Sequence, residues 1–70
     1  MLMTGSGRAA RVHYLPGTLR LQSDGDHVIC AVTGVRIPLA DLRYWSVARQ
    51  EPYVDAAASL EAERRAAASR

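Results

Sequence analysis

The 70-residue sequence contains no lysine, no phenylalanine and a single cysteine, Cys30. One cysteine excludes a disulfide within the chain and favours a reducing compartment, so we expect a cytoplasmic protein. No apolar run approaches the roughly 18 residues that a membrane span requires. The first residues also have no apolar segment of the kind found in secretory signals. Membrane insertion and secretion are therefore not expected.

Because lysine is absent, all nine basic residues are arginine, and they exceed the seven acidic residues by a net charge of +2. Together with the many alanines, this usage is typical of a GC-rich genome rather than of a surface selected for arginine. The apolar fraction of 49% and the charged fraction of 23% are ordinary for a globular chain. The length allows one domain.

Motifs of known catalytic sites are also missing. Thr33-Gly34 and Ser23-Asp24-Gly25 are better explained as hairpin turns than as a phosphate-binding loop. Asp41 and Asp55 do not form a paired-carboxylate pattern. We therefore predict no enzyme activity, no catalytic residue and no cofactor.

Cys30, His13 and His27 are the candidate metal ligands. A structural zinc site commonly takes four ligands in closely spaced pairs, which this chain lacks unless two chains share them. A nucleophilic cysteine needs an open, positively charged setting, whereas Cys30 lies between Ile29 and Ala31. We favour Cys30 as a small core residue and both histidines as surface residues, with no metal.

Residues 10–54 read as a β domain after a disordered segment at 1–9. Polar and apolar residues alternate over 11–15 and 18–22, on either side of a Pro16-Gly17 turn. A second turn at residues 23–26 precedes the apolar run 27–32, which we expect to be the central, most buried strand. The remaining predictions are a strand at 35–37 that ends at Pro38 or lies at an edge, a helical turn or bend at 39–42, and a final strand at 43–47. The pattern favours a mainly β fold, a small antiparallel meander of hairpins.

Residues 55–70 predict a C-terminal helix or tail. Asp55 is a good N-cap, and alanine, glutamate and arginine favour a helix from there on. Leu60 is its only large apolar residue, so the helix has little with which to dock. We expect it to be frayed and projecting.

The apolar side chains of residues 10–54 are too few to offset the cost of ordering the chain, and they occupy both faces of the central strands. The layer that covers the sheet is either the helix, which is poorly suited, or a second copy of the chain, and both features favour a homodimer. Trp45 is expected at the centre of its interface, and Ile37-Pro38-Leu39 is a plausible hinge for exchange of the last strand. The predicted interface residues are Ile29, Leu42, Tyr44, Trp45, Val47 and Tyr53.

An alternative function is weak binding of single-stranded nucleic acid. Arginines on the polar faces of neighbouring strands would supply cations, and Trp45 would supply a stacking ring. Nearby acidic residues and the low net charge argue against it, so a protein interface is favoured. The residues of this alternative are Arg11, Arg20, Arg36, Arg43 and Trp45.

The stretch from Cys30 to Tyr53 contains Cys-Ala-Val-Thr-Gly, Ile-Pro-Leu, Leu-Arg-Tyr-Trp-Ser and Gln-Glu-Pro-Tyr in order. This pattern resembles a family of short alphaproteobacterial proteins known only as a domain of unknown function. Val12 to Gly17 also resembles the first hairpin of that family. The resemblance implies a small β fold whose protomers exchange segments into a homodimer, and it implies no reaction, cofactor or substrate.

Overall fold

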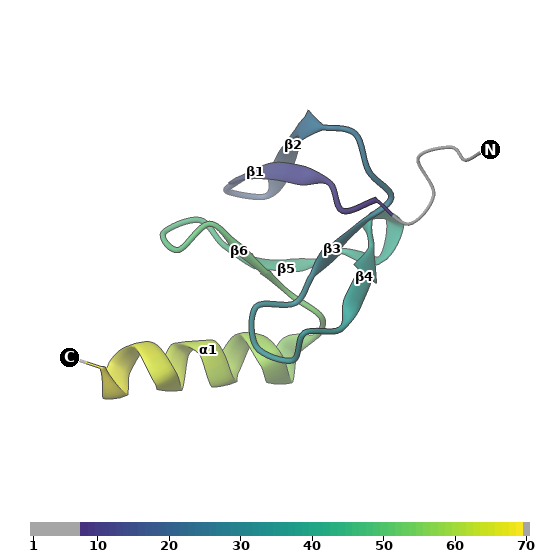
Figure 1. Cartoon of the computed structure of the whole chain (residues 1–70). Coiled ribbons are helices and arrows are strands. Elements are labelled where there is room, and N and C mark those ends of the chain that lie inside the picture. Colours follow the sequence, from purple (N-terminus) through teal and green to yellow (C-terminus); the bar gives the residue numbers. More distant parts are fainter. Residues whose placement is uncertain (1–7, 70) are drawn as a thin grey trace.

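A computed structural model describes residues 8–69 of the chain (Figure 1). Within them, six strands pair in sequence order into three antiparallel hairpins, followed by a helix. The expected mainly β fold of hairpins with a C-terminal helix is confirmed. The hairpins form three two-stranded sheets rather than one continuous sheet. The elements are β1 (Arg11–Leu15), β2 (Thr18–Ser23), β3 (His27–Ile29), β4 (Arg36–Pro38), a 3-10 turn (Leu39–Asp41), β5 (Tyr44–Ser46), β6 (Glu51–Tyr53) and α1 (Ala56–Ala68).

The β1–β2 hairpin forms where alternation and the Pro16-Gly17 turn predict it. Gly17 has φ +76°, which glycine adopts without steric cost. Tyr14 lies opposite Leu19, and His13 lies opposite Arg20. Tyr14 is buried, whereas His13 and Arg20 are exposed, so the hairpin has an inner face toward the core and an outer face toward solvent.

The run 27–32 is not one buried strand, and this prediction was wrong. β3 ends at Ile29, whose side chain is 44% exposed, and residues 31–33 form a turn. The cause is a tight loop in which the Cys30 N–H donates to Val35 O and the Gly34 N–H donates to Cys30 O. Gly34 permits this loop with φ +77°.

The second strand of the third hairpin was not predicted. Sequence patterns place the final strand at 43–47, yet β6 follows and pairs Pro52 with Trp45. Pro52 lacks an N–H, but its carbonyl faces away from β5 and accepts the Ala31 N–H at 3.0 Å. A proline in this edge position costs no ladder bond.

The helix docks, contrary to the expectation that it projects. Asp55 caps it as predicted, with its carboxylate accepting the Ala58 N–H at 2.8 Å. Ala58 and Ala62 lie one turn apart and are buried, whereas Leu60 is 65% exposed. Small side chains let the helix approach the third hairpin closely, so alanines rather than a leucine stripe form its docking face.

The expected disordered segment 1–9 falls mostly on residues 1–7, which lie outside the described part of the chain. Arg8 and Ala9 are ordered, because Arg8 O accepts the Asp26 N–H and Ala9 pairs with His27 in a parallel bridge. Gly25 makes this approach possible, since a Cβ there would fall 2.4 Å from Ala10 N.

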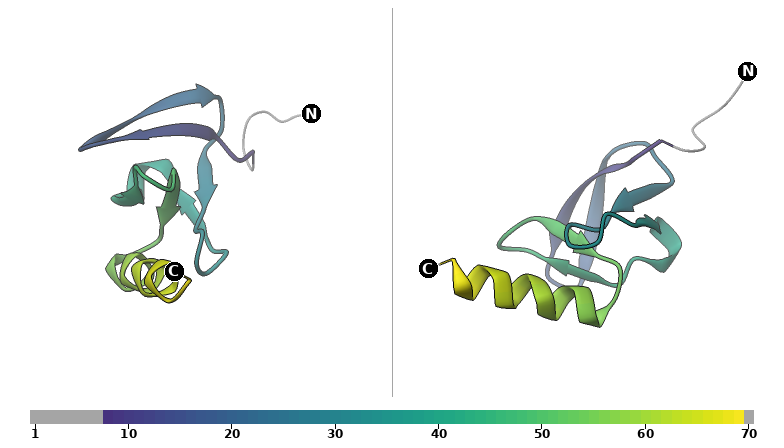
Figure 2. Two further views of the ribbon diagram at one scale, coloured as in Figure 1. Left: turned by 90° about the vertical axis from the view of Figure 1, so that its left-hand side faces the viewer. Right: turned by 60° about the horizontal axis from the view of Figure 1, so that its bottom comes forward.

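The core draws residues from all three hairpins and from α1, with the β1–β2 hairpin on one side of the third hairpin and α1 on the other (Figures 1 and 2). Within residues 8–69, no helix has the length and apolarity that a membrane span requires. Within the described chain the hydrophobic core cluster has only eight buried residues, and two of these are alanine. They are Tyr14, Val28, Cys30, Ile37, Leu42, Tyr53, Ala58 and Ala62.

Candidate binding site

Cys30 is a core residue, as predicted, and only 2% of it is exposed. Its Sγ accepts N–H groups from Thr33 at 3.4 Å and from Val54 at 3.3 Å. Burial raises the pKa of the thiol, but the hydrogen bonds from Thr33, Val32 and Val54 outweigh burial and leave this pKa below its usual value. No set of three metal-ligating side chains gathers among the described residues.

His13 lies on the exposed outer face of β1, whereas His27 is buried, which corrects its prediction as a surface residue. The His27 Nδ1 lies 2.7 Å from a carboxylate oxygen of Asp26. Both residues line a shallow pocket of about 330 Å³ with Arg36 and Pro38. The Asp26 contact gives the buried ring a polar partner, which a histidine in a core requires.

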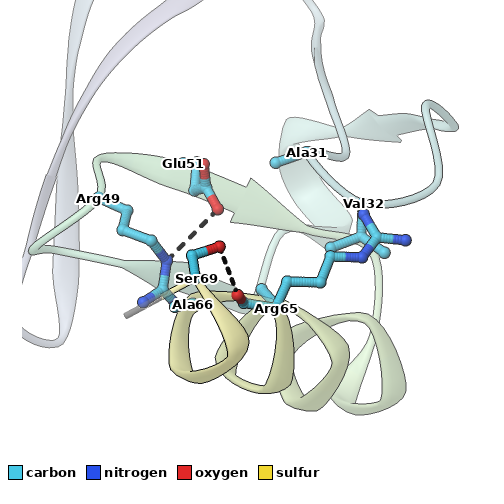
Figure 3. Close-up of a pocket in the computed structure, with 8 residues that line it drawn as sticks. Ala31, Val32, Arg49, Glu51, Arg65, Ala66 and Ser69 are labelled. Atoms are coloured by element: carbon cyan, nitrogen blue, oxygen red, sulfur yellow. Dashed lines mark hydrogen bonds and ion pairs between the residues drawn. The ribbon is translucent and has the colours of Figure 1, made fainter.

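A second pocket of about 180 Å³ lies between the Cys30 loop, β6 and the last turns of α1 (Figure 3). Its cations are already paired. Arg49 contacts Glu63 at 2.8 Å and Glu51 at 3.5 Å, and Arg65 contacts Glu61 at 3.1 Å. The bonds to Glu63 and Tyr53 raise the pKa of Arg49. This cluster ties β6 to α1 and is best explained as structural.

The predicted dimer interface divides into buried and exposed residues. Leu42 and Tyr53 belong to the core of the single chain, at 8% and 1% exposed. Trp45 is half-buried. The other three are 41–44% exposed and available for contact: Ile29, Tyr44 and Val47.

Trp45 packs inside the chain rather than at the centre of an exposed patch. Its ring lies 6.0 Å from that of Tyr14, and its Nε1 donates to Leu15 O at 2.9 Å. Trp45 therefore joins the third hairpin to the inner face of the first.

The nucleic-acid alternative places Trp45 beside four arginines on the polar faces of neighbouring strands. Arg11, Arg20, Arg36 and Arg43 are all exposed. Arg11 and Arg20 lie on the outer face of the β1–β2 hairpin, opposite to the side that Trp45 contacts. Arg36 is on β4, and Arg43 precedes β5. Arg11 and Arg20 therefore lie away from the stacking ring.

Gln50 is an important residue that the sequence analysis missed. It occupies the loop between β5 and β6 with φ 53°, an uncommon conformation for a residue other than glycine. Its Oε1 accepts the Tyr14 N–H at 2.9 Å, and its Nε2 donates to Tyr14 O at 2.8 Å. The side chain thus closes the outer edge of β1 as a neighbouring strand would. The Gln-Glu pair in the family pattern was the only signal for it.

Within the described residues 8–69, the other edge of this hairpin, formed by β2, has no neighbouring strand. Directly opposite residues of an antiparallel pair send their N–H and C=O groups either toward each other or both away. Because Tyr14 faces Gln50, Leu19 opposite it faces away from β1, and so does Leu21 two residues later. Within residues 8–69, neither Leu19 nor Leu21 has a further backbone partner on that side.

Other strand edges in the described chain are better covered. On β3, His27 O accepts the Ala10 N–H, and on β6, Pro52 O accepts the Ala31 N–H. Pro38 leaves β4 without one donor, and β4 and β5 have three residues each. β2 has six residues and lies on the side of the molecule opposite to α1 (Figure 2, left). Its edge is therefore the best candidate binding site.

One family model matches residues 21–62, and that family is described as an uncharacterised protein conserved in bacteria (DUF2093). Comparison with curated proteins and with solved structures finds no match to this chain.

Proposed function

The chain belongs to this family of uncharacterised bacterial proteins, whose description names no activity, and we therefore propose a function from the geometry. The proposed function is that of a non-catalytic binding module that holds a protein partner as an added strand on β2. We also propose that the chain is related more narrowly to alphaproteobacterial proteins and that it is located in the cytoplasm.

The edge of β2, which pairs with no strand among residues 8–69, carries the proposal. A row of free N–H and C=O groups is a template for another strand, and strand addition is a common mode of peptide recognition. The hairpin is also held in place, because Gln50 and Trp45 attach β1 to the third hairpin. A fixed template lowers the ordering cost of binding.

Blocking a single N–H tests the proposal. The probe is a soluble seven-residue peptide of alternating threonine and valine, added to the ¹⁵N-labelled chain and followed by NMR. We expect the amide signals of Leu19 and Leu21 to shift. Leu21→Pro should abolish this response, because proline removes an N–H that points away from β1, whereas Leu21→Thr keeps that N–H and should retain binding. Equal binding by both variants would contradict the proposal.

We also propose that the chain associates with itself, as the sequence analysis expects. This second proposal is supported by the small core and by the large apolar residues that are at least 41% exposed. Among these, Ile29, Tyr44 and Val47 are the predicted contacts. The full set is Leu21, Ile29, Val35, Tyr44, Val47 and Leu60.

A further inference from the structure

We infer that the strand bound on β2 is an acidic segment of another protein, with a carboxylate opposite Arg20 and apolar residues opposite Leu19 and Leu21. This inference rests on the proposed function and names the chemistry of its partner.

The outer face of the hairpin supplies the positive charge. Arg20 is exposed near the middle of β2, and His13 lies directly opposite it on β1. Arg11 is exposed two residues further along the same face. Neither β1 nor β2 contains an acidic residue. A strand added to β2 places one side chain beside Arg20, where a carboxylate forms a favourable cross-strand pair.

The inner face supplies the apolar part of the pattern. Leu19 and Leu21 project toward the same side as Tyr14, and Leu21 is 49% exposed. Apolar side chains of an added strand would cover Leu21 and continue the inner face of the hairpin. The recognised segment is therefore apolar, acidic, apolar at successive positions.

A second copy of β2 fits this edge poorly. Antiparallel self-pairing through Leu19 and Leu21 of both copies sets Arg20 against its own counterpart, and like charges directly opposite are destabilising. If the two β2 strands are shifted along each other so that the arginines no longer lie opposite, the pairing reaches the bulge between Leu21 and Ser23, where Gln22 has no directly opposite residue. Charge and a bulge are devices that oppose edge-to-edge pairing. An acidic foreign strand needs only the unbulged part of β2.

Two fluorescein-labelled peptides test the inference by fluorescence anisotropy: Thr-Val-Glu-Val-Thr and its counterpart with lysine in place of glutamate. We expect the glutamate peptide to bind more tightly, on the order of fivefold, and the preference to weaken with added salt. Arg20→Glu should reverse the preference, and Arg20→Gln should remove it. Leu21→Pro should abolish binding of both peptides. A synthetic chain with an N-methyl group on Leu21 replaces this variant if the proline prevents folding.

The outcomes separate this inference from the proposed function. If both peptides bind equally and the blocked edge binds neither, strand addition stands and the acidic preference is overturned. If the blocked edge binds as well as the wild type, or if no peptide binds, both are overturned. If blocking the edge converts a dimer into monomers, the occupant is a second copy and the acidic partner is overturned.

Discussion

Gln50 has a strained backbone, and its side chain bonds to the N–H and C=O of Tyr14 as a neighbouring strand would. A left-handed conformation costs a residue with a Cβ about 1–2 kcal/mol, and the two bonds to Tyr14 offset this cost. Gln50→Ala keeps the strain and loses the bonds, so we expect the free energy of unfolding to fall by about 1–3 kcal/mol. Gln50→Gly loses the bonds and relieves the strain, so it should be the milder change. Urea unfolding of both variants measures the difference. An alanine variant as stable as the wild type would show that the bonds from Gln50 to Tyr14 do not stabilise the fold.

Cys30 was interpreted in the sequence either as a core residue or as a reactive or metal-binding thiol, and these interpretations differ in their chemistry. As a core residue that accepts two N–H groups, it should tolerate Cys30→Ser with a loss of about 1–3 kcal/mol in stability, since the hydroxyl fits the sulfur's site imperfectly. Thermal unfolding measures the loss. Elemental analysis of the purified wild type is the companion experiment, and stoichiometric zinc there would contradict the core interpretation.

These two residues mark what local sequence can predict. The burial of Cys30 follows from its apolar neighbours in a β-branched run. The role of Gln50 does not, because its partner is 36 positions away and a positive φ has no reliable signature outside glycine. Local sequence could not predict the edge of β2 that pairs with no strand among residues 8–69 either, because this edge depends on which strands do not pair in the folded chain.

At the scale of elements, the helix is tested by placing a charge on its docking face. Ala62→Glu buries a carboxylate against the third hairpin and should cost more than about 2 kcal/mol. Ala57→Glu makes the same change at an exposed position of α1 and is the matched control, expected within about 0.5 kcal/mol of the wild type. Removal of residues 55–70 should lower the melting temperature, opposite to what a projecting helix predicts. Equal stability of the two glutamate variants would mean that the helix does not dock.

Two of the three predicted hairpin turns join paired strands, whereas Ser23-Asp24-Gly25 links β2 to β3, which belong to different sheets, so that hairpin prediction was wrong. Pro16-Gly17 and Thr33-Gly34 mark two hairpins, and Asp55 marks the start of α1. β6 was missed because Arg49-Gln50-Glu51-Pro52 reads as a polar loop. The docking of α1 was missed because alanine contributes little apolar area, so a close-packed alanine face resembles a solvated one in sequence.

At the scale of the whole molecule, the small core still predicts self-association. Leu42 and Tyr53 are now placed inside the chain, which leaves Ile29, Tyr44 and Val47 for the interface. Val47→Asp should shift the equilibrium toward monomers, and Thr33→Asp, at another exposed loop position, is the control. Sedimentation equilibrium at low micromolar concentration measures both. A folded wild-type monomer of 7.6 kDa under these conditions would end the homodimer hypothesis.

The two edges of the first hairpin differ in a way that deuterium can report. Tyr14 belongs to a strand with a partner on each side, one a strand and the other an amide side chain, so its N–H is sheltered as in the interior of a sheet. Leu19, directly opposite, turns its N–H away from β1, and no backbone group within residues 8–69 accepts it there. In D₂O, the Tyr14 N–H should therefore exchange slowly, whereas the N–H of Leu19 opposite it should exchange fast. The contrast should vanish when Gln50 is replaced by alanine, and a bound strand should slow Leu19 as well.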